Sequence, residues 1–256
     1  VDDPGARDLP VPEGVDVIGF GTGGPAQVRA VEIEASGAGI AFDLRLGSLP
    51  AERVRLGMPG IHNVRNALAA AAVGWRLDVP PAVIREGLEA VRGVERRFEI
   101  LYESENVMIV DDYAHHPSEI AATLAAARAG WKDRRVVAVF QPHLYSRTRD
   151  FAADFGDALE AAGLVFVTDV YAAREAPIPG VTGRLVADAA AKAGATVRYL
   201  PDEVAAEADA VAIVEGALRP GDLVVTLGAG DIDGLARQLV ARRVEAGGRG
   251  RVGAPA

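Results

Sequence analysis

The sequence contains no cysteine, which excludes disulfide bonds and thiolate metal sites and is compatible with a reducing compartment. It contains no signal-peptide-like segment and no apolar run that approaches the length of a membrane span, so we expect a cytoplasmic protein without a membrane partner. Basic runs are also missing, apart from the glycine-rich Arg249-Gly250-Arg251. Together with a net charge of −9, this argues against a nucleic-acid partner, because binding to phosphates requires basic patches.

With 256 residues, half of them hydrophobic, the chain is long enough for one large domain or two smaller ones. The first 58 residues alternate polar and apolar positions between frequent turns, which predicts half-buried, antiparallel strands at 15–18, 27–33, 39–44 and 53–56. Two helices are expected next, at 62–77 and 81–91.

From Arg97 onward, apolar runs alternate with amphipathic helices, which is typical of a parallel sheet covered on both faces. Strands are expected at 98–102, 107–110, 135–140, 164–168, 197–200 and 223–227. Helices are expected at 117–129, 148–162, 182–193, 202–218 and 231–245. We place a domain boundary near Gly93 and expect the residues beyond about 246 to be disordered.

Histidine is rare, and its four occurrences are confined to three turns. The richest turn is Asp111-Asp112-Tyr113-Ala114-His115-His116-Pro117, which stands between an apolar strand and an Ala-rich helix, where open α/β sheets bind ligands. His116 can cap the helix, and Asp111, nearest the strand, is expected to be a structural acceptor. Capping of the helix does not require Asp112, Tyr113 or His115. Asp112 can accept from ribose hydroxyls, Tyr113 can stack on a base, and His115 can reach an anion.

The turn after the strand at 135–140 contains His143, followed by Arg147 and Arg149 at the start of a helix. A helix N-terminus disfavours cations, and a bound carboxylate or phosphate would reverse that effect, so an anion site is expected here. Local neutralisation of one arginine by Asp150 is the alternative.

His62 precedes Asn63 and Asn66, which are three residues apart on one face of a helix. Two carboxamides at this spacing could bind the edge of an adenine, and simple helix capping is the alternative.

The glycine loop at 19–24 fits a dinucleotide motif but precedes another strand, so that interpretation fails. The loop at 228–231 could line the same crevice as the other turns. A zinc site from Asp112, His115 and His143 is conceivable, although no H-x-x-x-H pattern exists.

Taken together, these motifs resemble those of the Mur ligases, the ATP-dependent amide-forming enzymes of peptidoglycan synthesis. The resemblance covers residues 1–245 and rests on motifs that occur in order. They are Gly60-Ile61-His62-Asn63-Val64-Arg65-Asn66, Gly93-Val94-Glu95-Arg96-Arg97-Phe98, the turn at 111–117, Phe140-Gln141-Pro142-His143-Leu144-Tyr145-Ser146-Arg147-Thr148, Asp169-Val170-Tyr171-Ala172-Ala173-Arg174-Glu175 with Pro177-Ile178-Pro179-Gly180, and Gly228-Ala229-Gly230-Asp231-Ile232.

The resemblance implies a role for each matching residue. Asn63 and Asn66 would hold the adenine of ATP, and Arg97 would contact its phosphates. Asp112 and Tyr113 would contact the ribose and its surroundings. His115, His143 and Arg147 would be the catalytic residues on the amino-acid and nucleotide-sugar side, with Arg147 pairing the carboxylate of L-alanine. Many family members carry arginine where this chain has Leu144, so that contact is absent or supplied by Arg149.

The implied reaction activates a carboxylate. ATP, with Mg²⁺, would phosphorylate UDP-N-acetylmuramate, and the amine of L-alanine would attack the acyl phosphate to give an amide, ADP and phosphate. The G-x-x-G-K-[ST] phosphate loop of the family is missing from this sequence, and most Mg²⁺ ligands are expected outside it.

The expected fold class is therefore α/β, with a parallel-sheet, Rossmann-like C-terminal domain preceded by part of a mixed α/β ATPase domain with antiparallel strands. Residues 1–94 would be the C-terminal part of the central ATP-binding domain, 95–245 the C-terminal domain and 246–256 a disordered tail. Alone, such a chain is expected to bind nucleotide weakly, if at all, and not to catalyse. The alternatives are a tripeptide-recycling ligase acting on the same nucleotide sugar, a non-catalytic nucleotide-binding module and a metal-dependent hydrolase.

Overall fold

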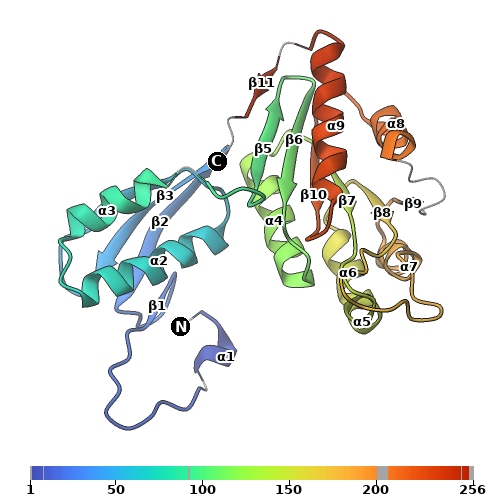
Figure 1. The fold of residues 1–256 in the computed structure, drawn as a ribbon. Coiled ribbons are helices and arrows are strands. Elements are labelled where there is room, and N and C mark those ends of the chain that lie inside the picture. The colour runs from blue at the N-terminus through green and yellow to red at the C-terminus, as the bar shows by residue number, and fades with distance from the viewer. Residues whose placement is uncertain (1, 8, 92, 201–206, 249, 254–256) are drawn as a thin grey trace. The chain divides into compact units, whose positions relative to one another are not determined.

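A computed structural model describes residues 2–7, 9–91, 93–200, 207–248 and 250–253 (Figure 1). The chain divides into two compact units, Val1–Arg92 and Gly93–Ala256. Among the helices in these described ranges, none has the length and apolar character needed to cross a lipid bilayer.

The first unit is a small sheet with two helices packed on it. Its strands β1 (Phe20–Gly21), β2 (Val28–Ser36), β3 (Gly39–Leu46) and β4 (Glu52–Leu56) lie side by side in that order. The β1–β2 pair is parallel and the two later pairs are antiparallel. The helices are α2 (Ile61–Arg76) and α3 (Pro81–Ala90), and a short α1 (Pro4–Arg7) lies near the start of the chain. Alternate residues of β3, such as Phe42, are buried in the core that includes Leu68 of α2.

One expected strand of this unit does not form. Residues 15–18 have no regular structure, although their polar and apolar residues alternate. Val15 and Val17 are 55% and 59% exposed, so the alternation has no apolar surface to pack against. The first strand is instead the two-residue β1, which begins at Phe20 inside the glycine loop at 19–24. Because β2 follows that loop, the rejection of a dinucleotide motif there is confirmed.

The second unit is built on a seven-stranded sheet with the order β11-β5-β6-β10-β7-β8-β9. Its strands are β5 (Glu99–Glu103), β6 (Val107–Asp112), β7 (Val136–Phe140), β8 (Leu164–Thr168), β9 (Val197–Leu200), β10 (Asp222–Leu227) and β11 (Arg251–Val252). From β6 to β9 all neighbours are parallel, and β5 and β11 are antiparallel additions at one edge. Strands β6, β7, β8 and β10 are buried along their whole length, as expected for the inside of a parallel sheet.

Helices cover both faces of this sheet (Figure 1). They are α4 (Pro117–Gly130), α5 (Tyr145–Asp150), α6 (Ala152–Leu159), α7 (Arg184–Ala193), α8 (Glu207–Ala217) and α9 (Ile232–Glu245). One core joins the sheet to α4, α6 and α7, and a second core joins its opposite face to α8 and α9. The expected α/β class, with a mostly parallel sheet in one part and an antiparallel one in the other, is confirmed.

Two helices of the second unit differ from the expectation or lie partly outside the described residues. The helix expected at 148–162 is two helices, because the backbone leaves helical geometry at Phe151 (φ −115°, ψ 17°). This break places the Phe151 ring against His116, with ring centroids 5.2 Å apart, while Phe155 and Leu159 remain in the core. Of the helix expected at 202–218, residues 202–206 lie outside the described ranges, and the described part is α8.

The tail beyond residue 246 was expected to be disordered, and this is wrong for Arg251 and Val252. They pair with Glu103 and Tyr102 of β5, and the Gly253 N–H donates to Leu101 O at 2.9 Å. The outer backbone groups of β5 would otherwise face solvent at the sheet edge, so β11 supplies them with partners. Composition alone did not reveal this pairing, because it depends on the exposed edge of a distant strand.

Candidate functional site

Three strands of the second unit end at the same level. Leu227, the last residue of β10, is in register with Asp112 of β6 on one side and with Phe140 of β7 on the other. The turns after these strands therefore emerge together at what we call the carboxyl edge of the sheet. Most of the residues singled out in the sequence lie in these turns, and parallel α/β sheets bind ligands at this edge.

The turn after β6 begins α4 with a capping box. His116 is the N-cap residue: its Nδ1 accepts from the Ser118 N–H at 3.4 Å, and Pro117 occupies the first turn. Glu119 Oε2 accepts from the backbone N–H groups of His115 and His116, each at 3.0 Å. The structural explanation for His116 is therefore confirmed.

Asp111 is a buried structural acceptor, as expected. It is 1% exposed, and its carboxylate accepts from the Thr226 hydroxyl on β10 and from Arg96 Nε at 2.9 Å. Arg96 also donates to the carbonyls of Gly228 and Gly230, at 2.7 and 2.9 Å. Burial raises the pKa of Asp111, while Thr226 and Arg96 oppose that change. Arg96 thus joins the glycine loop at 228–231 to the turn after β6.

Asp112, expected to bind ribose, is turned into the protein. It is 5% exposed, and its carboxylate accepts from Phe98 N at 3.0 Å, Ala114 N at 2.8 Å and Thr123 Oγ1 at 3.2 Å. Burial raises the pKa of Asp112 to about 6, because these donors compensate the lost hydration only in part. The geometry gives this carboxylate the role of bracing the turn, and a direct ribose contact stays a prediction.

Tyr113 is the exposed member of the turn, with 36% of its surface accessible. The guanidinium of Arg96 lies 5.0 Å from its ring centre, and that of Arg97 lies 5.8 Å away. The neighbouring arginines therefore differ in environment. Arg96 is held internally by Asp111, whereas Arg97 is exposed and free to reach a ligand. Tyr113 and Arg97 are together, as the expected nucleotide contacts require.

A series of aromatic rings runs along the carboxyl edge. His115 lies edge-on to Tyr113 on one side and to His143 on the other, with ring centroids 5.4 and 5.6 Å apart. His143 in turn stacks on Tyr171, with centroids 5.8 Å apart and planes 13° apart. The turns after β6, β7 and β8 are thereby joined through side chains.

The two histidines of this series have different hydrogen-bonding partners. His115 Nδ1 lies 3.0 Å from the carbonyl of Tyr113, so Nδ1 carries the proton and Nε2 offers a lone pair when the ring is neutral. His143 Nδ1 lies 3.5 Å from Arg147 Nη1, which favours the tautomer with the proton on Nε2. Burial, with the nearby His115 and Arg147, lowers the pKa of His143, although Glu175 opposes this. In the neutral form, His143 therefore offers its proton at Nε2, and His115 offers a lone pair at Nε2.

Arg147 is carried by the short helix α5, in the turn after β7. The first turn of α5 is held by Glu175, whose Oε2 accepts from Ser146 N at 2.8 Å and whose Oε1 accepts from Ser146 Oγ at 2.5 Å. Arg149 differs from Arg147, because it is exposed and its Nε lies 2.7 Å from Asp150 Oδ1. The local neutralisation weighed above as an alternative therefore applies to Arg149, and Arg147 remains the candidate anion ligand.

Asn63 and Asn66 belong to the first unit. Asn63 is 9% exposed, and its Nδ2 donates to Pro59 O at 2.7 Å. Asn66 is exposed, and its Nδ2 lies 3.5 Å from Asn63 Oδ1. The two carboxamides are adjacent as expected, but only Asn66 offers its polar atoms to solvent. Both begin the α2 helix, whose N-cap position is Gly60 and not His62 or Asn63.

Three residues at the carboxyl edge were not among the candidate site residues expected from the sequence. They are Arg96, Tyr171 and Glu175. The sequence could have indicated Tyr171 and Glu175, because they follow β8 just as His143 follows β7. For Arg96 the sequence offered no basis for separating it from Arg97, since the two are adjacent arginines.

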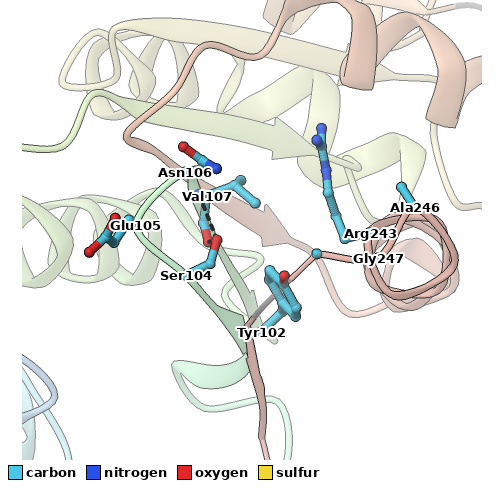
Figure 2. Close-up of a pocket in the computed structure, with 9 residues that line it drawn as sticks. Tyr102, Ser104, Glu105, Asn106, Val107, Arg243, Ala246 and Gly247 are labelled. Atoms are coloured by element: carbon cyan, nitrogen blue, oxygen red, sulfur yellow. Dashed lines mark hydrogen bonds between the residues drawn. The ribbon is translucent and has the colours of Figure 1, made fainter.

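A hollow of about 670 Å³ lies away from this site (Figure 2). Its lining comes from the turn between β5 and β6, which includes Ser104 and Asn106, and from the end of α9, which includes Arg243. That turn leads into the amino end of β6, whereas the aromatic series follows the carboxyl end. The hollow contains none of the residues that the sequence marked.

The described residues contain no group of three or more histidine, aspartate or glutamate side chains that could hold a metal ion. The zinc site considered from Asp112, His115 and His143 is therefore not assembled within the described ranges. The reason is that the oxygens of Asp112 are directed to internal donors such as Ala114 N. The described residues therefore give no support to a hydrolase that uses these three side chains as zinc ligands.

Comparison with known proteins identifies the class. A family model described as the glutamate ligase domain of the Mur ligases matches residues 96–230. Over 234 residues the chain is 46% identical to the UDP-N-acetylmuramate–L-alanine ligase of Chlorobaculum parvum, covering 89% of this chain and 48% of that protein. The chain belongs to the Mur ligase family.

The relatives point to one branch of that family. A ligase of the same name from Mycobacterium sp. strain JLS is 44% identical over 250 residues, covering 94% of this chain and 50% of that protein. The crystal structure of UDP-N-acetylmuramate–alanine ligase from Thermotoga maritima has a TM-score of 0.74 at 28% identity, covering 90% of this chain and 48% of that one. This chain thus spans about half the length of the curated relatives it matches.

Proposed function

We propose that this chain supplies the C-terminal half of an ATP-dependent ligase that joins L-alanine to UDP-N-acetylmuramate in the cytoplasm. Residues 1–94 would complete a central ATP-binding domain, and 95–245 would form the C-terminal domain. Identities of 44–46% to relatives of that name, over most of this chain, support the proposal. The single structural observation that carries it is the grouping of His115, His143 and Arg147 at the carboxyl edge.

In this proposal Arg147 binds the carboxylate of L-alanine. No ion pair of the described residues involves Arg147, so its charge remains available to a ligand, and a guanidinium can hold a carboxylate with two parallel hydrogen bonds. Arg149 is the less suitable arginine, because its guanidinium is paired with Asp150. Leu144 stands where many family members have arginine, so Arg147 provides this recognition without a second arginine.

The histidines would act on the reacting groups. A neutral His143 donates from Nε2 to an oxygen that gains negative charge, and the Nε2 lone pair of His115 accepts a proton from the attacking amine. ATP transfers its phosphoryl group to the lactyl carboxylate, and Mg²⁺ would assist in the complete enzyme. The residues that we assign to nucleotide are Asn63, Asn66, Arg97, Asp112 and Tyr113.

The proposal is tested with a chimera in which this chain replaces the corresponding half of the Chlorobaculum parvum ligase. We expect ADP release that requires UDP-N-acetylmuramate and L-alanine together, and no release from this chain alone. Arg147→Ala should raise the KM for L-alanine roughly 30-fold or more, because removing one partner of a desolvated charge pair costs about 2–5 kcal/mol. The matched Arg149→Ala variant should leave it unchanged.

Two results would contradict the proposal. A chimera that folds but accepts a tripeptide in place of L-alanine would support the recycling ligase. A folded chimera without ADP release, beside an active parent enzyme, would favour a non-catalytic nucleotide-binding module.

A further inference from the structure

The segment after β8 holds the turn after β7 by its backbone. Tyr171 N donates to Pro142 O at 2.8 Å, and Leu144 N donates to Tyr171 O at 3.0 Å. These two bonds flank His143 and form an isolated parallel bridge between His143 and Tyr171. The position of the His143 backbone is therefore set by Tyr171 and not by β7 alone.

The side chain of Tyr171 also contacts His143. It lies almost parallel to the His143 ring, at 13° and 5.8 Å. Its other neighbour is Gly230, where an added Cβ would lie only 2.6 Å from Tyr171 Cγ. The close approach of the glycine loop thus restricts movement of the Tyr171 ring away from His143.

Glu175 holds the other end of the same turn. Its two carboxylate oxygens accept from the backbone N–H and the hydroxyl of Ser146, at the first turn of α5. That helix is preceded by Leu144 at φ 70°, a left-handed conformation that is unfavourable for leucine. An unfavourable backbone conformation is kept only where surrounding contacts enforce it. The hydrogen bonds of Tyr171 and Glu175 hold the backbone on both sides of Leu144.

We propose that Tyr171 and Glu175 are positioning residues: Tyr171 sets the plane of the His143 ring, and Glu175 sets the start of α5 and with it Arg147. The inference rests on the proposed function, because its importance follows from the roles given to His143 and Arg147. Neither Tyr171 nor Glu175 is required to touch a substrate. The geometry also explains the residue types, since a flat ring is needed for the stack and two acceptor oxygens are needed for Ser146.

The test is an NMR titration of the histidines in this chain, which has only four of them. Tyr171→Ala admits water to the His143 ring, so the titration midpoint of His143 should rise by roughly half a pH unit or more. Tyr171→Phe keeps the stacked ring and should leave the midpoint as in the unaltered chain. Glu175→Gln removes the carboxylate that favours the imidazolium, so the His143 midpoint should fall.

Two signals serve as controls for the fold and for Arg147. The backbone amide signals of the first turn of α4, which His116 caps, should be identical in all variants that fold. The Arg147 Nε–H signal should shift in Glu175→Gln, which leaves Ser146 with a weaker acceptor. It should not shift in the matched Glu160→Gln, which alters an exposed residue at the end of α6.

The proposal is overturned if folded Tyr171→Ala and Glu175→Gln both leave the His143 midpoint and the Arg147 signal unchanged. It is also overturned if Tyr171→Phe changes the midpoint as much as Tyr171→Ala does. If Tyr171→Ala does not fold, the proposal is decided by the His143 midpoint and the Arg147 signal of Glu175→Gln, together with the His143 midpoint of Tyr171→Phe. No substrate is involved, so an inactive chimera with the expected titrations would reject the ligase assignment and leave the positioning role standing.

Discussion

The Arg96 guanidinium donates to Asp111 Oδ2 at 2.9 Å, across fifteen positions of the sequence, in a nearly solvent-free setting. Asp111 is the penultimate residue of β6, and Arg96 precedes β5. Because Arg96 also donates to the carbonyls of Gly228 and Gly230, one side chain joins three segments at the carboxyl edge. The pair therefore holds these three segments together, whereas the adjacent Arg97 is exposed at the same edge.

Replacing Arg96 by alanine should lower the free energy of unfolding of the second unit by about 3–5 kcal/mol, the usual effect of removing one partner of a buried ion pair. Asp111 would lose its charged partner at 1% exposure, and two carbonyls would lose their donor. Urea unfolding measures the change. Arg97→Ala is the matched control and should alter the free energy of unfolding by less than about 0.5 kcal/mol. Equal effects of the two substitutions would contradict the assignment.

Asp112 should titrate with a midpoint of about 6, because burial raises its pKa from 3.8. A carboxyl with a raised folded-state pKa contributes stability below its unfolded pKa and loses it as the pH rises through the folded value. Between pH 4 and pH 7 this loss amounts to about 2.4 kcal/mol.

Carboxyl ¹³C NMR measures the Asp112 midpoint directly, and Asp112→Asn should remove this part of the pH dependence in urea unfolding. A midpoint at or below 4 would show that the donors Phe98 N, Ala114 N and Thr123 Oγ1 outweigh burial.

Gly230→Ala should destabilise the second unit by about 1–3 kcal/mol, the usual effect of overpacking. The added Cβ would meet Gln141 Oε1 and would lie 2.6 Å from Tyr171 Cγ, so the Tyr171 ring must move. Thermal unfolding gives the loss of stability, and the His143 signals report the displaced ring. Gly216→Ala is the control in α8, where an added Cβ meets nothing within 4 Å. It should raise stability by about 0.5–1 kcal/mol, and a loss there would contradict the steric argument.

The sequence specified the strands of the second unit well because their apolar runs are continuous, and β6 and β8 begin at the residues expected. It also placed His115 and His143 at strand ends, since a residue after a parallel strand must lie at the carboxyl edge. The strand order could not be derived. Strand β10 comes from the last quarter of the chain and lies between β6 and β7.

The errors have a common physical origin. Val15 and Val17 alternate with polar residues as strand residues do, but no partner buries them. The break at Phe151 and the pairing of β11 depend on contacts with His116 and with the edge strand β5. Such contacts join residues far apart in the sequence, and local periodicity carries no information about them. The same limit concealed Tyr171 and Glu175, whose partners lie in the preceding turn.

Asn63 and Asn66 should separate stability from nucleotide binding. Asn63→Ala removes the buried donor to Pro59 O, so the first unit should lose about 1–3 kcal/mol of stability. Asn66 is exposed, and Asn66→Ala should change stability by less than about 0.5 kcal/mol. In the chimera, Asn66→Ala should raise the KM for ATP about tenfold, the equivalent of one hydrogen bond of about 1.4 kcal/mol, and leave the KM for L-alanine unchanged. An unchanged KM for ATP, together with normal folding, would remove Asn66 from the adenine contacts and leave this surface of α2 without a role in nucleotide binding.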